Sequence, residues 1–99
     1  MALTHWGFIY TAAGAPAEGR VTVEDTGECR TVLVGVAKTE QAIPVAKQLV
    51  ADGVQLIELC GGFGPIWTAR ILEAIDNAVP IGSVAYGPES VDGVHAIFS

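Results

Sequence analysis

Two consecutive β-α-β units constrain the fold of this chain more than any other feature. Apolar runs typical of buried strands cover 31–37, 54–60 and 81–86. Apolar residues at helical spacing separate them, over 39–53 and 66–78. Because crossovers between parallel strands are right-handed, these segments predict three parallel strands. If the strand order runs in one direction, both helices lie on the same face of the sheet.

The remaining segments add strands at both ends of the chain. Residues 4–11 alternate with period two, which predicts a strand, and 12–20 are rich in Ala, Gly and Pro, as loops are. A short extra strand is expected over 20–26, and a short edge strand over 94–98. We therefore expect a single α/β domain over 1–99, with a mixed, mostly parallel sheet of four or five strands and two main helices.

The face of the sheet without helices needs another cover. The strand runs lack polar alternation, and 51% of the 99 residues are hydrophobic while 16% are charged. Trp6, Phe8 and Tyr10 share one face of the first strand, and such a stripe belongs to a core or a subunit interface more often than to a ligand platform. A second subunit is the simplest cover, so we expect a homo-oligomer.

Composition excludes several classes of partner. The net charge is −6, and the five Lys and Arg residues are scattered, which argues against nucleic acid. No secretory segment is recognised and no run approaches ~18 apolar residues, so no membrane partner is expected. Cys29 and Cys60 form neither a C-x-x-C motif nor a disulfide framework, which favours a reducing, cytoplasmic setting.

The segment 58–65 is the best candidate for a functional site. It leads from a predicted strand into a predicted helix through Gly61, Gly62, Phe63 and Gly64. Such turns bind anions in α/β proteins, because glycines permit close approach and free amides point at the ligand. The spacing is neither G-x-G-x-x-G nor a P-loop. The turn therefore binds a small carboxylate or phosphate, or it is only a tight strand-to-helix connection.

Three side chains near this turn are candidates for catalysis. Cys60 precedes a helix N-terminus, where a thiol ionises more readily, although a lone Cys is usually a small buried apolar residue. Glu58 interrupts an apolar strand, where a carboxylate works as an acid or base or forms a structural pair, for example with Arg70. Tyr86, at the end of the strand over 81–86, either reaches the same crevice or caps the core.

No metal and no cofactor are predicted. His5 and His95 lie on the first and last predicted strands and meet only if these strands are neighbours. A metal would need a third ligand, and the sequence contains neither H-x-H nor H-E-x-x-H.

The run 54–65, with 46–53 before it, resembles a family of small bacterial proteins of about a hundred residues, described as a domain of unknown function. The pattern shared with that family is I-E-L-C-G-x-F-G-P after a helix of A-K-x-L-V-x-x-G-V type. The resemblance covers most of the chain and implies a compact α/β domain without implying an activity. The strand–Cys–Gly turn also loosely resembles aspartate/glutamate racemases, which are larger and use two cysteines in paired lobes; this chain has no second matching segment.

Two functions from different classes fit these residues. In one, the protein is a small enzyme acting on an anionic metabolite, with Cys60 as nucleophile or acid/base, Glu58 as its proton partner and the amides of Gly61 to Gly64 holding an oxyanion. Proton abstraction next to a carbonyl, or hydrolysis of a small acyl compound, would suit that arrangement. In the other, the turn binds a ligand without catalysis, and the protein is an oligomeric sensor, carrier or accessory subunit.

Overall fold

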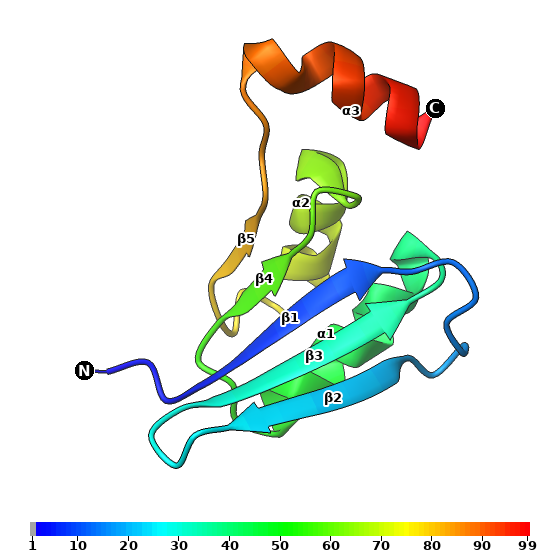
Figure 1. Cartoon of the computed structure of the whole chain (residues 1–99). Coiled ribbons are helices and arrows are strands. Elements are labelled where there is room, and N and C mark those ends of the chain that lie inside the picture. The colour runs from blue at the N-terminus through cyan, green and yellow to red at the C-terminus, as the bar shows by residue number, and fades with distance from the viewer. Residues whose placement is uncertain (1) are drawn as a thin grey trace.

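A five-stranded sheet organises the molecule in the computed structural model, which describes residues 2–99 (Figure 1). The strands are β1 (His5–Thr11), β2 (Arg20–Asp25), β3 (Arg30–Val36), β4 (Ile57–Leu59) and β5 (Ile81–Ser83). Their order is β2-β3-β1-β4-β5, and only β2 runs antiparallel to its neighbour. The predicted α/β class and mostly parallel sheet are confirmed, and the strand expected over 20–26 is β2.

Both main helices cover one face of this sheet, as predicted (Figure 1). The helical elements are η1 (Thr39–Gln41), α1 (Ala42–Ala51), α2 (Gly64–Ala74), η2 (Pro88–Ser90) and α3 (Val91–Phe98). Gln41, rather than Thr39, fixes the entry into α1, because its Oε1 accepts hydrogen bonds from the amides of Ala37 at 3.1 Å and Lys38 at 3.0 Å. Within residues 2–99, no helix has the length and hydropathy needed to cross a membrane.

The core lies between the sheet and these two helices. Its largest fully buried side chains come from three strands and α2, and they are Ile9, Val36, Ile57, Leu59 and Ile71. On β1, Gly7 leaves room for Leu49 of α1, since a Cβ there would lie 2.7 Å from Leu49 Cδ1. The helix therefore packs closely on the central strand.

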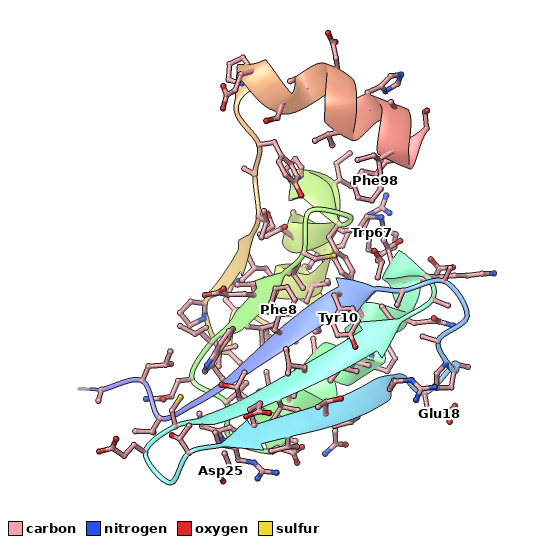
Figure 2. The ribbon with its side chains drawn as sticks, in the orientation of Figure 1. Phe8, Tyr10, Glu18, Asp25, Trp67 and Phe98 are labelled. Atoms are coloured by element: carbon pink, nitrogen blue, oxygen red, sulfur yellow. The ribbon has the colours of Figure 1, made fainter. Side chains whose placement is uncertain are left out.

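The opposite face of the sheet carries the aromatic stripe. Figure 2 shows Phe8 and Tyr10 on the side turned away from α1 and α2. Their rings stack with centroids 6.2 Å apart, and Tyr10 also lies against Gly35 of β3. Trp6, Phe8 and Tyr10 are half-buried, because one side of each ring lies against the sheet and the other side has no layer over it within residues 2–99.

The C-terminal segment differs from the prediction. Residues 94–98 were expected to form an edge strand, and they belong to α3. Val91, Val94 and Ile97 recur every third residue, which is helical spacing. The preceding chain leaves the sheet after β5, so no neighbouring strand is available for pairing. α3 lies beyond the carboxyl ends of the strands (Figure 1).

Strands β4 and β5 are shorter than the apolar runs that contain them. The predicted strand over 54–60 reduces to Ile57–Leu59, because the amide of Val54 still donates to Leu49 O at the end of α1, at 3.2 Å. The strand over 81–86 reduces to Ile81–Ser83, which pairs only with β4. Apolar sequence therefore extends beyond the residues that have a partner strand.

Candidate functional site

The carboxyl ends of β1 and β4 meet at one edge of the sheet. Both strands are parallel neighbours, with Ile9 opposite Leu59. Thr11 ends β1, and Cys60 follows directly after β4. Ligands in α/β proteins bind at this kind of edge, so the predicted turn is placed where a site is expected.

The sulfur of Cys60 is held by Thr11. The Thr11 amide donates to Cys60 Sγ at 3.3 Å, and Thr11 Oγ1 lies 3.7 Å from the same sulfur. The Cys60 amide donates to Ile9 O at 3.1 Å, which fixes the backbone beneath it. Both cysteines are free thiols, and Cys60 is half-buried. The Thr11 amide is thus a hydrogen-bond donor to the sulfur, whereas either the Thr11 hydroxyl or the Cys60 thiol can donate in the second contact.

Two glycines in the turn make room for side chains from other elements. A Cβ on Gly62 would lie 2.6 Å from Thr11 Oγ1 and 3.5 Å from Cys60 Sγ. A Cβ on Gly61 would lie 2.6 Å from Cε2 of Tyr86. These glycines are therefore required by close approach, and they bring Thr11, Cys60 and Tyr86 around one turn.

The turn also presents free amides at the start of α2. Within residues 2–99, the amides of Gly61 and Gly62 have no hydrogen-bond acceptor. The amide of Phe63 is used, since it donates to Cys60 O at 3.1 Å, and the Phe63 ring is buried in the core. Gly64 begins the helix with φ of +69°. Gly61 and Gly62, rather than Phe63, thus have backbone donors that are not used within the described chain.

Glu58 lies apart from this group. It occupies the exposed middle position of β4, opposite Phe8 and Gly82, on the face that carries no helix. The expected burial of this carboxylate is therefore wrong, because the face on which it lies has no covering layer. The alternative pair with Arg70 is not formed either, since the Arg70 guanidinium lies 4.7 Å above the Trp67 ring.

Tyr86 is present at the site, although not as the end of a strand. It follows β5 in the segment that leads to η2, and its half-exposed ring lies against Gly61. Thr11 was missed by sequence reasoning. Thr11 is the last residue of the first predicted strand, and it is polar. This position indicates a site residue only when that strand is known to lie parallel beside β4.

The two histidines occupy different elements. His5 starts β1, at the end of the strand opposite to the turn, and its Nε2 is buried without a partner in the described chain. His95 lies in α3, so the idea that the two meet on neighbouring strands is wrong. Among residues 2–99, no three His, Cys, Asp or Glu side chains come together as metal ligands would.

The fold is similar to that of two solved structures. The "Crystal structure of arylmalonate decarboxylase" matches with a TM-score of 0.52 and 17% identity, over 93% of this chain and 44% of that chain. The "Structure of unliganded arylmalonate decarboxylase" matches with a TM-score of 0.51 and 19% identity, over 94% and 46%. The chain thus spans less than half the length of these proteins, and the likeness concerns the fold.

Comparison by sequence identifies a family. No curated protein matches the chain. A family model covers residues 4–99, almost the whole of the sequence. This extent of agreement confirms the resemblance inferred from the residues themselves, and the chain belongs to the Family of unknown function (DUF6506).

Proposed function

We propose that this protein is a small enzyme that acts on a small carboxylate, with the Cys60 thiol as the group that transfers a proton. The observation that carries the proposal is the contact of Thr11 with Cys60 Sγ, 3.3 Å from the amide nitrogen and 3.7 Å from Oγ1. A cysteine that only filled the core would gain nothing from two polar groups at its sulfur. The free thiols also suit a reducing cytoplasm.

The proposed reaction is proton transfer at the carbon next to the carboxylate. The thiolate takes a proton from that carbon, the S–H bond forms, and the electron pair of the broken C–H bond moves into the carboxylate as an enediolate. The amides of Gly61 and Gly62 would stabilise the growing negative charge on its oxygens. Return of the proton from Cys60 to the same carbon breaks the S–H bond, forms a C–H bond with the electron pair of the enediolate and regenerates the thiolate.

The solved structures with a similar fold support the choice of a carboxylate. They are named as decarboxylases of an arylmalonate, which is a carboxylate substrate. A carboxylate also fits free amides at a helix N-terminus, where the partial charge is positive. We prefer a carboxylate to a phosphate for this reason.

A non-catalytic binding role is the second candidate, and one observation favours it. Within the described part of the chain, no carboxylate or imidazole forms a hydrogen bond with Cys60; its side-chain partner is Thr11. Glu58, the predicted proton partner, is exposed on the open face of the sheet. In this alternative the turn binds the carboxylate as part of a sensor or carrier.

The reactivity of Cys60 separates the two candidates. With Cys29→Ser to leave one thiol, we expect iodoacetamide to alkylate Cys60 at lower pH than it alkylates Cys29 in a Cys60→Ser variant. Thr11→Val removes the hydroxyl that contacts the sulfur and should slow the alkylation of Cys60 at a given pH. Alkylation of both thiols over the same pH range, with no effect of Thr11→Val, would contradict the catalytic role.

Ligand binding is tested separately from chemistry. A thermal-shift screen of small mono- and dicarboxylates should find stabilisation of about 2.7 kcal/mol at a hundredfold excess over Kd. Gly61→Ala, which places a Cβ against Tyr86, should abolish it. Glu58→Gln should leave binding unchanged, because Glu58 lies apart from the turn, at the exposed middle position of β4. Stabilisation that survives Gly61→Ala would move the ligand site away from this turn.

A further inference from the structure

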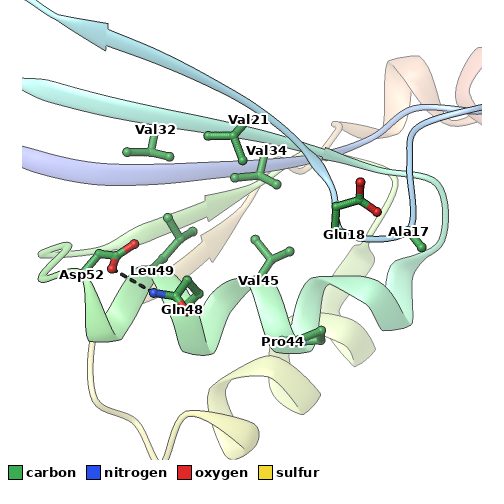
Figure 3. Close-up of a pocket in the computed structure, with 10 residues that line it drawn as sticks. All are labelled: Ala17, Glu18, Val21, Val32, Val34, Pro44, Val45, Gln48, Leu49 and Asp52. Atoms are coloured by element: carbon green, nitrogen blue, oxygen red, sulfur yellow. Dashed lines mark hydrogen bonds between the residues drawn. The ribbon is translucent and has the colours of Figure 1, made fainter.

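A cavity lies under the edge of the sheet, away from Cys60. It has a volume of ≈ 300 Å³ between α1 and strands β2 and β3. Figure 3 shows Val21, Val32 and Val34 pointing from the strands toward Val45 and Leu49 of α1. The cavity exists because α1 covers β3 and β1 but leaves β2 overhanging. Val21 is 60% exposed, whereas Val34 is only 3% exposed.

The two charged residues that line this cavity are both acidic. Glu18, in the loop before β2, and Asp52, after the last residue of α1, are its only charged lining residues. Figure 3 places them at opposite ends of the valine-lined surface. Asp52 accepts a hydrogen bond from Gln48 Nε2 at 2.9 Å, and within residues 2–99 neither carboxylate forms an ion pair. An apolar surface between two unneutralised carboxylates is complementary to an apolar body that carries positive charge.

We propose that this cavity binds a small organic cation, namely a protonated amine on an aromatic or aliphatic body. The apolar body would contact Val21, Val34 and Leu49, and the ammonium group would lie beside Glu18 or Asp52. The volume matches the lower end of small-ligand pockets and is too small for a helix or a folded partner. The site is independent of the carboxylate site at Cys60, and its ligand has the opposite charge.

Three probes of the same shape test the charge preference. Phenethylammonium, phenethyl alcohol and 3-phenylpropanoate are titrated into the ¹⁵N-labelled full chain and followed by amide chemical shifts. The amine should shift the amides of Val21, Val34, Val45 and Leu49 and bind about threefold or more tightly than the alcohol. The propanoate should leave these four amides unmoved. About 0.5 M salt should remove the advantage of the amine over the alcohol, because the carboxylates are exposed.

Charge variants locate the interaction. Glu18→Gln and Asp52→Asn should together weaken amine binding on the order of threefold or more and leave alcohol binding unchanged. Glu24→Gln is the matched control, since Glu24 lies on β2 but pairs with Thr31 on the opposite face of the sheet. Val21→Lys, at an exposed position that tolerates the change, should abolish amine binding. The amide spectrum of each variant shows whether it is folded.

Three results would overturn the proposal. One is equal binding of the amine and the alcohol in the unmodified chain. Another is amine-induced shifts outside the cavity lining. The third is an equal loss of amine binding in Glu24→Gln and in the double variant of Glu18 and Asp52, since the effect would then come from net charge and not from the cavity.

Discussion

Gly62 sits where it does because Thr11 leaves it no space for a side chain. The nearest atom to a Cβ at this position would be Thr11 Oγ1, at 2.6 Å, a distance that real Cβ atoms essentially never show. The same threonine contacts Cys60 Sγ. A single polar residue at the end of β1 therefore shapes the turn and holds the sulfur.

This contact predicts coupled effects on stability. Gly62→Ala should lower the free energy of unfolding by about 1–2 kcal/mol, since the added methyl group forces Thr11 to move. In a Thr11→Ala background the same change should cost clearly less. Urea denaturation of the four proteins measures both values, and Gly82→Ala, with no atom within 4 Å of the added Cβ, is the control. Equal costs in the two backgrounds would show that the clash is absent.

Gly64 is restricted in a different way. Its φ is +69°, and no atom lies within 4 Å of a Cβ built there. Gly64→Ala should therefore cost about 1 kcal/mol of unfolding free energy through backbone strain alone. The same urea measurements test this, and a cost near zero would mean that the turn relaxes to a negative φ.

Local pattern was sufficient for part of the site and insufficient for the rest. Cys60, Gly61 and Gly62 could be marked because a strand, a glycine-rich turn and a helix follow each other in the sequence. Thr11 could not, because its proximity to Cys60 arises from β1 lying between β3 and β4. The exposure of Glu58 could not be predicted for a related reason. An apolar strand sequence indicates that the strand is buried, but it does not show which face of the sheet is covered by helices.

At the scale of elements, Leu49 is the largest of the buried side chains that pack α1 onto the sheet, beside Ala42 and Ala46. Leu49 is 3% exposed and packs into the space left by Gly7 of β1. The hydrogen bond from Val54 N to Leu49 O also joins the end of this helix to the chain that enters β4. The Leu49 side chain therefore joins the helix to the central strand, and its backbone carbonyl joins the helix to the chain that enters β4.

Leu49→Ala should accordingly be the most damaging change in α1. We expect it to lower the free energy of unfolding by about 3 kcal/mol, as large-to-small changes in a packed core do. Lys47→Ala, on the exposed side of the same helix, should stay within about 0.5 kcal/mol. Thermal or urea unfolding compares them, and similar values for the two variants would contradict the packing.

α3 has no comparable anchor. It packs mainly against η2, and Val91, Ile97 and Phe98 are exposed by 55%, 77% and 58%. A helix of eight residues is marginal in water without tertiary contacts. The weak packing of this segment explains why the prediction of an edge strand over 94–98 was wrong. Val94 to Phe98 is apolar enough for a strand, and its helical spacing decides the outcome only because no strand edge reaches it.

At the scale of the whole molecule, two apolar surfaces have no cover within residues 2–99. One is the aromatic face with Trp6, Phe8 and Tyr10, and the other is the C-terminal segment with Tyr86 and α3. The one-sided placement of α1 and α2 was predictable, because two right-handed crossovers in one direction allow nothing else. The position of β1 at the centre of the sheet was not predictable, because no local sequence pattern shows which strands will be its neighbours.

These surfaces predict a homo-oligomer. Size-exclusion chromatography with light scattering should find a dimer or larger species at micromolar concentration, and amide exchange in α3 should slow as concentration rises if this helix is at the interface. A single species of 10.3 kDa at all concentrations would contradict the prediction. In that case the aromatic rings alone would be enough to shield from water the face of the sheet that carries no helix.

The contact between Thr11 and Cys60 also makes the reactivity of the Cys60 thiol a probe of strand pairing during folding. The two residues are 49 positions apart, so the amide of Thr11 reaches the sulfur only once β1 lies beside β4. Such long-range parallel pairing is slow to form. Short pulses of alkylating reagent during refolding should therefore modify Cys60 freely at first and then at the native rate. The refolding time at which the alkylation rate changes is the time at which β1 pairs with β4.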